Sequence, residues 1–315
     1  MAEEGIPLVD MNDWLRPEKR AGFVQAVGRG LEEFGFVSVT GHGIDLNRLD
    51  AAYAMARAFF DLPTAVKTRY ETPADGRQRG YTSFAVEHAK DTLVPDLKEF
   101  FHVGRTLPGD HPLHLSGDVP VNGFPAELPG FEALFKAHFV AMEEFAGRLL
   151  SATALYLGHE EAYFSRLTKD GNSVLRLIHY PDVGDSPPGA VRAAAHEDIN
   201  LLTVLPVSTK PGLEVMTRDG RWLAVNPPPN VMVCDTGDMM ALLTGNRLPA
   251  TTHRVVNPEY SDGGRLSMPF FLHPHPDALL VEEVPGLQAA VRTRQFFHER
   301  LRAIGVEPTE PKAES

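Results

Sequence analysis

The stretch AHEDINLLTVLP, residues 195–206, opens the part of the chain that decides its fold. His196 and Asp198 stand two residues apart at the head of an apolar run, 199–205, which predicts a buried strand. Residues i and i+2 of a strand point to one face, so an imidazole and a carboxylate are expected side by side. A second imidazole, His253, opens the β-branched segment 251–256 within TTHRVVNP. The pattern thus predicts three potential metal ligands on strands.

Two histidines and one carboxylate are the ligand set of a non-heme Fe(II) site, which leaves coordination positions open for a cosubstrate and O2. Such a site also needs a partner for an anionic cosubstrate, and GRLSMPFF (264–271) supplies candidates. Arg265 and Ser267 again stand two apart in a segment of strand character, so they are expected to share a face. A guanidinium can bind a carboxylate with two parallel hydrogen bonds, and the serine hydroxyl can donate another.

On these residues the sequence resembles the isopenicillin N synthase-like family of Fe(II)/2-oxoglutarate-dependent dioxygenases. The family pattern is HxD, then a distal His, then RxS, and all three occur here in order. The likeness runs from IPLVD (6–10), through the turn GHGI (41–44), to the last predicted helix. It implies an α+β protein with a mainly β core, a distorted double-stranded β-helix (jelly roll) flanked by helices.

The resemblance also implies roles for the site residues. His196, Asp198 and His253 would bind Fe(II), which 2-oxoglutarate would chelate through its keto oxygen and C1 carboxylate. Arg265 and Ser267 would bind the C5 carboxylate, because a buried dianion without paired donors is costly. The reaction would consume O2, release succinate and CO2, and remove hydrogen from a small-molecule substrate, with ascorbate as a candidate reductant.

The substrate contacts are less specified by the sequence. In the strand SVLRLIHYP (173–181), Arg176 and Tyr180 share one face. Tyr180 either donates to the C5 carboxylate or packs, and Arg176 binds substrate, braces the cosubstrate or forms a salt bridge. By family resemblance, residues near the active-site mouth are further candidates, with Phe101 favoured as a core residue: Tyr81, Phe84, Glu87 and Phe101.

Other candidate ligands are less convincing. Glu197, between the two expected ligands, should face away from them on a strand, and HExxH is absent because residue 200 is Asn. His273 and His275 could chelate a metal, but a loop after the last strand is the favoured interpretation. Cys234 is expected to pack in a strand.

Helical spacing of apolar residues predicts helices over 17–34, from 45, from 63, over 130–157 and over 287–304. Short strands are expected at 6–10, 36–40 and 98–103, and Pro- and Gly-rich residues 105–129 are expected to form a loop. From residue 173 about eight short strands with turn signals predict the jelly roll, including a hairpin turning at Asp219 and Gly220.

We expect one compact unit with five regions. They are an N-terminal region of helices and edge strands (1–110), supporting helices (130–168), a catalytic jelly-roll core (172–278), a C-terminal helix (285–305) and a flexible tail (306–315).

Composition limits the setting. The chain has 315 residues, one cysteine and a net charge of −12, so it can bury a large core but has no internal disulfide. The charge argues against nucleic-acid and anionic-membrane partners. Because neither a secretory signal nor a spanning segment is expected, the sequence predicts a cytoplasmic protein; it does not specify the oligomeric state.

The same ligands serve hydroxylation, desaturation, ring closure and ethylene formation within the resembled family. The alternatives are therefore a 2-oxoglutarate-independent Fe(II) oxidase/cyclase of the isopenicillin N synthase type, or an ethylene-forming activity. A noncatalytic jelly-roll binding module is a more remote alternative, which failure to bind iron would favour.

Overall fold

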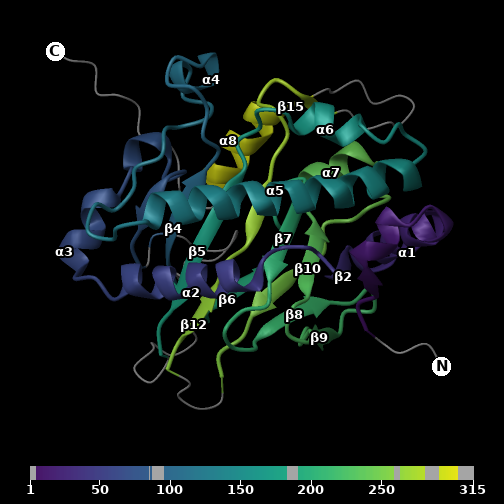
Figure 1. Cartoon of the computed structure of the whole chain (residues 1–315), viewed down its shortest axis with the longest axis horizontal. Helices are drawn as coiled ribbons and strands as arrows, with labels where there is room; N and C mark the ends of the chain where they lie inside the picture. Colours follow the sequence, from purple (N-terminus) through teal and green to yellow (C-terminus); the bar gives the residue numbers. More distant parts are fainter. Residues whose placement is uncertain are drawn as a thin grey trace.

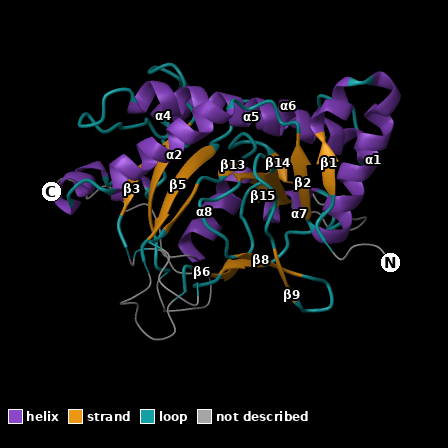
Figure 2. Cartoon of the chain, turned by 60° about the horizontal axis from the view of Figure 1, so that its bottom comes forward, coloured by secondary structure: helices purple, strands orange, loops and turns teal. Residues whose placement is uncertain are grey.

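Two β-sheets face each other, and helices cover the outer face of the larger sheet (Figures 1 and 2). The computed structural model describes residues 5–84, 86, 96–182, 191–258, 263–280 and 291–303. Figure 2 shows the order of the layers, from the helices through the larger sheet to the smaller sheet. This arrangement is the double-stranded β-helix that the sequence predicts.

Within the described residues the larger sheet has nine strands, in the order β1-β2-β10-β7-β13-β5-β4-β3, with β12 also paired to β5. Only β1 and β2 run parallel among these described pairs. The strands are β1 (Leu8–Asp10), β2 (Phe36–Thr40), β3 (Gly80–Thr82), β4 (Glu99–Gly104), β5 (Val174–Tyr180), β7 (Leu202–Pro206), β10 (Met232–Thr236), β12 (Arg265–Ser267) and β13 (Phe270–Leu272).

The smaller sheet has the order β6-β11-β8-β9. Its strands are β6 (Ala193–His196), β8 (Leu213–Met216), β9 (Trp222–Ala224) and β11 (His253–Val255). A separate pair, β14 (Leu279–Leu280) and β15 (Val291–Arg292), precedes the last helix. Phe36 and Val233 of the larger sheet pack against Leu213 and Val215 of the smaller one, which joins the two sheets at one end.

The α-helices are α1 (Pro17–Phe34), α2 (Leu46–Phe60), α3 (Thr64–Lys67), α4 (Pro112–Leu115), α5 (Phe131–Tyr156), α6 (Tyr163–Thr168), α7 (Asp238–Leu243) and α8 (Thr293–Ala303). Short 3-10 helices span Met11–Leu15, Thr68–Tyr70 and Pro73–Asp75. No helix among the described residues combines the length and the apolarity that a membrane span requires.

Local sequence signals set the helix ends. Pro17 occupies the first turn of α1, where its missing N–H costs nothing, and Gly35 ends that helix at φ 69°. Asp45 caps α2 by accepting from the backbone N–H of Asn47. These ends agree with the predicted ones.

The main core lies between α5 and the larger sheet. Phe139 of α5 meets Phe270 of β13 edge to face, with ring centroids 5.0 Å apart. Phe135, Met142 and Phe145 are also fully buried along the same helix. Alternation along β5 leaves the opposite face of the sheet, with Arg176, Ile178 and Tyr180, for a cavity between the sheets.

Several predicted elements need correction. Residues 196–205 are not one strand, because β6 ends at His196 and β7 begins at Leu202. The loop predicted over 105–129 contains α4, and β10 is followed by α7 rather than by further strand. The last helix begins at Thr293, after the β15 pairing of residues 291–292. The predicted tail, 306–315, lies outside the described residues.

His138 on α5 is fully buried, and neither ring nitrogen has a hydrogen-bond partner among the described residues. Burial lowers the pKa of His138 from 6.5 to about 4. Between pH 6.5 and pH 4 the unfolded chain therefore binds more protons at this residue than the folded protein does. The free energy of unfolding accordingly decreases as the pH falls through this range. Between pH 7 and pH 5 we expect the native protein to lose about 2 kcal/mol more stability than His138→Leu.

Urea unfolding at both pH values measures this difference. Phe139→Leu, a neighbouring apolar change, is the matched control and should retain the native pH dependence. Equal pH dependence in the native protein and His138→Leu would contradict the expectation.

Candidate metal and cosubstrate site

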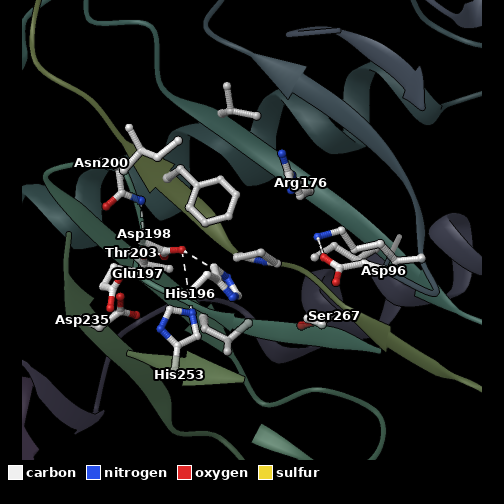
Figure 3. Close-up of a pocket in the computed structure, with 18 of the residues that line it drawn as sticks. Asp96, Arg176, His196, Glu197, Asp198, Asn200, Thr203, Asp235, His253 and Ser267 are labelled. Atoms are coloured by element: carbon white, nitrogen blue, oxygen red, sulfur yellow. Dashed lines mark hydrogen bonds and ion pairs between the residues drawn. The ribbon is translucent and has the colours of Figure 1, made fainter. Parts of the chain in front are cut away.

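His196, Asp198 and His253 converge in the cavity between the sheets (Figure 3). His196 ends β6 and His253 begins β11, and these two residues lie directly opposite each other in the antiparallel pair. Asp198 follows in the connection from β6 to β7. One ligand atom from each residue lies within 4.8 Å of the others.

Hydrogen bonds at the far side of each ring fix both tautomers. Nδ1 of His196 lies 2.8 Å from the carbonyl of Ala194, and Nδ1 of His253 lies 3.2 Å from that of Thr251. A carbonyl only accepts, so each Nδ1 carries the hydrogen and each Nε2 presents a lone pair. The two Nε2 atoms lie 3.9 and 3.8 Å from Oδ1 of Asp198, so three electron-rich atoms face one another and a cation fits among them.

The Asp198 carboxylate is held from its other side. Oδ2 accepts a short hydrogen bond from the hydroxyl of Thr203, which in turn accepts from Asn200 at 2.8 Å. Partners of this kind orient a metal ligand and leave its second oxygen for the ion. Asp235 lies next to this group, and burial together with the Asp198 charge raises its pKa well above the usual range.

The backbone of the Asp198 turn bonds to the start of α7. The N–H of Asp238 donates to the carbonyl of Asp198 at 2.7 Å, and that of Met239 donates to Asn200 at 3.2 Å. A Cβ at Gly237 would stand 2.4 Å from the Asn200 carbonyl oxygen, so only glycine permits this approach. These bonds explain why the predicted strand is interrupted at Asp198.

The neutral state of His196 suits a ligand. Burial lowers the pKa of this imidazole to about 4, with a further contribution from the neighbouring His253, while the Asp198 carboxylate acts in the opposite direction. A neutral imidazole keeps the Nε2 lone pair that a metal requires.

Arg265 and Ser267 lie on β12 with their side chains buried and in the same cavity. The Nε of Arg265 donates to the carbonyl of Lys210 at 3.0 Å, and Nη2 donates to Oγ of Ser208 at 2.8 Å. Nη1 is buried without a hydrogen-bond partner among the described residues. A buried guanidinium with an unused donor requires an acceptor, so the arrangement fits a carboxylate ligand.

Tyr180 lies directly opposite Arg265 in the β5–β12 pair and also lines the cavity. The Arg265 guanidinium carbon lies 5.1 Å from the centre of the Tyr180 ring. Burial lowers the pKa of Arg265, and the phenols of Tyr180 and Tyr53 oppose that shift. The predicted cosubstrate residues are therefore brought together beside the candidate metal ligands, in a cavity of about 520 Å³.

Comparison with known proteins supports the same chemistry. Residues 6–127 match the family described as the N-terminal region of a non-haem dioxygenase in morphine synthesis, and residues 171–274 match the 2OG-Fe(II) oxygenase superfamily. The chain is 30% identical over 287 residues to the 2-oxoglutarate-Fe(II) type oxidoreductase hxnY of Emericella nidulans, covering 88% of this chain and 82% of that protein.

This chain belongs to the isopenicillin N synthase-like family of Fe(II)/2-oxoglutarate-dependent dioxygenases. It is therefore an oxidoreductase that uses Fe(II), 2-oxoglutarate and O2. The validamycin A dioxygenase of Streptomyces hygroscopicus is a further relative, 29% identical over 88% of this chain and 79% of its own length.

Solved structures agree with the fold. A 2OG-Fe(II) oxygenase family protein of Caulobacter crescentus superposes with a TM-score of 0.85 and 39% identity, covering 95% of this chain and 99% of its own. A Neurospora crassa protein solved in complex with alpha-KG and thymine gives a TM-score of 0.83 at 26% identity, covering 96% and 98% of the two chains.

Arg176 lies on the cavity side of β5 in this dioxygenase, as the strand pattern predicts. Its guanidinium carbon lies 4.1 Å from the centre of the Phe100 ring and 5.4 Å from that of Phe271. Its Nε donates to Nε2 of His102 at 2.6 Å, and Nδ1 of His102 lies 3.0 Å from the Arg77 carbonyl. Nδ1 therefore carries the hydrogen, and His102 is a neutral acceptor that fixes Arg176.

Two proposed substrate contacts lie elsewhere. Tyr81 is opposite Phe101 in the β3–β4 pair, so both face the helices, where Tyr81 donates to the buried Glu99. Phe84 is 41% exposed and does not line the cavity. Phe101 packs in the core, as favoured, whereas Glu87 lies outside the described residues.

The other residues considered as metal ligands do not join the candidate metal group. His273 lines the cavity, but Nδ1 of His275 accepts from the backbone of Asp277 outside it, so the two histidines do not form a chelating pair. Glu197 touches the cavity but is exposed, and its carboxylate accepts from the Thr252 hydroxyl instead of joining the three candidate ligands; Cys234 is buried in the core. Among the described residues, only His196, Asp198 and His253 form a group of three candidate ligands.

Sequence reasoning missed several residues that shape the cavity. Lys98 pairs with Asp96 at 2.8 Å, and the other Asp96 oxygen accepts from the N–H of Ala194, two residues before His196. From α8, Phe297 and Arg300 close part of the wall, and Arg300 pairs with Asp238 at 3.0 Å. The position of Asp96 just before a predicted strand was the one sequence signal for its bond to β6. Nothing in the sequence indicates that α8 lies against the cavity.

We expect His196→Ala or Asp198→Ala to lower the Fe(II) affinity of this dioxygenase by about 100-fold or more. Loss of a residue that only orients a ligand costs up to about 100-fold in metal affinity, and these substitutions remove a ligand itself. Iron-dependent turnover should be lost with it. Anaerobic calorimetric titration with Fe(II) measures the affinity.

Glu197→Gln is the matched control, because Glu197 stands between the two ligands but is exposed. It should bind iron like the native enzyme. Native-like iron binding by His196→Ala and Asp198→Ala would show that these residues do not hold the metal.

Proposed function

We propose that His196, Asp198 and His253 bind Fe(II), and that Arg265 and Ser267 bind the distal carboxylate of 2-oxoglutarate, in an enzyme that oxidises a small molecule. The observation that carries the proposal is the shared cavity. It contains both the three facing ligand atoms and the buried guanidinium whose Nη1 lacks a partner among the described residues. Ascorbate as an added reductant remains part of the proposal.

The protein's own residues bind and orient the reactants. Arg265 and Ser267 fix one end of the 2-oxo acid, while the tautomers of His196 and His253 direct both lone pairs to one point. Bound iron and 2-oxoglutarate supply the oxidative decarboxylation that yields succinate and CO2 and activates O2 for oxidation of the substrate. Ile178, Leu205 and Val255 line the cavity with apolar surface that excludes water from the reacting groups.

The substrate is proposed to lie on the side of the cavity formed by Arg176, Phe271 and α8. The cavity is of a size that holds a small organic molecule. Arg176 is held by two aromatic faces and a neutral histidine, so it is positioned to contact a polar group of the substrate. Glu87 remains a proposed contact. Hydroxylation or desaturation is the proposed outcome. A small-molecule substrate is supported by the name of one relative, validamycin A dioxygenase, and by the thymine in the Neurospora crassa complex.

We also propose that the five regions expected from the sequence have the roles given to them there, with residues 172–278 as the catalytic core. The acidic charge of −12 and the single cysteine support a cytoplasmic enzyme without nucleic-acid or membrane partners.

Anaerobic reconstitution with Fe(II) and 2-oxoglutarate tests the proposal. We expect a visible metal-to-ligand charge-transfer band, followed in air by succinate release that the correct small molecule stimulates. Product formed without succinate would favour an oxidase/cyclase instead. Absence of both iron binding and turnover would favour a noncatalytic binding module.

Arg265→Ala should raise the 2-oxoglutarate concentration required for half-maximal turnover by about 100-fold, because losing a buried charged partner costs several kcal/mol. The Fe(II) affinity should stay near the native value, since Arg265 is not a ligand. Steady-state kinetics with varied 2-oxoglutarate measures the effect.

Arg221→Ala, at an exposed arginine on the β8–β9 hairpin, is the control and should not change this requirement. An unchanged requirement in Arg265→Ala would refute the assigned role of Arg265.

A further inference from the structure

We propose that Ser208 is a positioning residue of the cosubstrate site, which turns the hydroxyl hydrogen of Ser267 toward the ligand carboxylate. The inference rests on the proposed function of Arg265 and Ser267. Ser208 does not itself line the cavity, and it follows β7 by two residues.

Backbone pairing places Ser208 beside β12. The N–H of Thr209 donates to the carbonyl of Leu266 at 3.1 Å, and the N–H of Leu266 donates to the Thr209 hydroxyl at 2.9 Å. Leu266 stands between Arg265 and Ser267, so these bonds hold the segment 208–210 against both residues. The position of Ser208 is thus set by the sheet edge rather than by its own side chain.

The direction of the first hydrogen bond is fixed by chemistry. A guanidinium only donates, so Nη2 of Arg265 donates to Oγ of Ser208 across 2.8 Å. The Ser208 oxygen is therefore an acceptor in this contact, and its own hydrogen is available for another bond.

The second bond then takes a preferred direction. Oγ of Ser267 lies 3.0 Å from Oγ of Ser208 and is the acceptor that the described residues place within reach of the Ser208 hydrogen. If Ser208 donates there, Ser267 accepts and keeps its own hydrogen for the cavity that it lines. In the reverse order Ser208 would accept twice, and its hydrogen would have no partner among the described residues, which is unfavourable in a partly buried site.

The resulting chain runs from Arg265 through Ser208 to Ser267 and ends on the ligand carboxylate. Such chains strengthen each member by polarisation and remove rotational freedom from the final hydroxyl. Loss of Ser208 leaves Nη2 of Arg265 without its acceptor and leaves the Ser267 hydroxyl without a fixed orientation. The effect should be confined to ligands that have the distal carboxylate.

Binding of two different 2-oxo acids distinguishes a positioning role of Ser208 from a general loss of structure at the site. In the anaerobic Fe(II)-loaded enzyme, we expect Ser208→Ala to raise the dissociation constant for 2-oxoglutarate roughly tenfold, as for loss of one or two hydrogen bonds. Affinity for 2-oxobutyrate, which has the same 2-oxo acid group but no distal carboxylate, should not change. Ser208→Thr, which keeps the hydroxyl, should restore 2-oxoglutarate binding. The charge-transfer band and calorimetry both report these affinities.

Ser165→Ala, at an exposed serine on α6, is the control for loss of a hydroxyl elsewhere. Native-like 2-oxoglutarate affinity in Ser208→Ala, or equal weakening of both 2-oxo acids, would overturn the inference. Ser208→Cys provides a second test if the alanine variant does not fold, and it should show the same selective loss. Failure of the native enzyme to bind 2-oxoglutarate would instead refute the proposed function.

Discussion

The site depends on two lone pairs that face the same carboxylate oxygen. Backbone carbonyls hold the hydrogens of His196 and His253 on the far sides of their rings, so neither histidine can donate to Asp198. Among the described residues no hydrogen bond reaches Oδ1 of Asp198 from either ring, and a cation is the partner that the proposed function places among the three atoms. The rest of the fold brings these three side chains together from separate strands and a turn.

The two sheets contribute different groups of residues to the cavity. The smaller sheet presents the two histidines opposite each other, whereas the larger sheet presents Arg265, Ser267 and Arg176 from adjacent strands. The long helix α5 packs on the outer face of the larger sheet and leaves the inner face free for the cavity. The reactants can therefore be enclosed without exposing the main core to them.

Spacing in the sequence predicted much of this arrangement, because alternation along a strand is a local property. It placed the three candidate metal ligands and the Arg265–Ser267 pair among strand residues, and the structure brings them into one cavity with the inward face of β5. It failed for Asp198, where bonds to the start of α7 interrupt the strand. The family resemblance suggested Tyr81 as a substrate contact, but its register with β4 turns it away from the cavity.

Other contributors carried no local signal. Thr203 and Ser208 are ordinary residues of a strand and its end, and their importance arises only from the partners that the fold places beside them. Similarly, Phe297 meets the cavity only because α8 returns to it after a long separation in the chain. Pattern and spacing cannot specify contacts of this kind, although the family resemblance did specify the architecture around them.

The tight approach at Gly237 has a practical consequence for anyone who wishes to alter this enzyme's selectivity. The turn that bears Asp198 rests directly on that glycine, so side chains introduced there would displace Asp198, a proposed iron ligand. Phe297 of α8 also lines the cavity, and it contributes no ligand to the candidate metal group. Libraries built at Phe297 would vary the shape of the cavity without replacing any of the three candidate ligands.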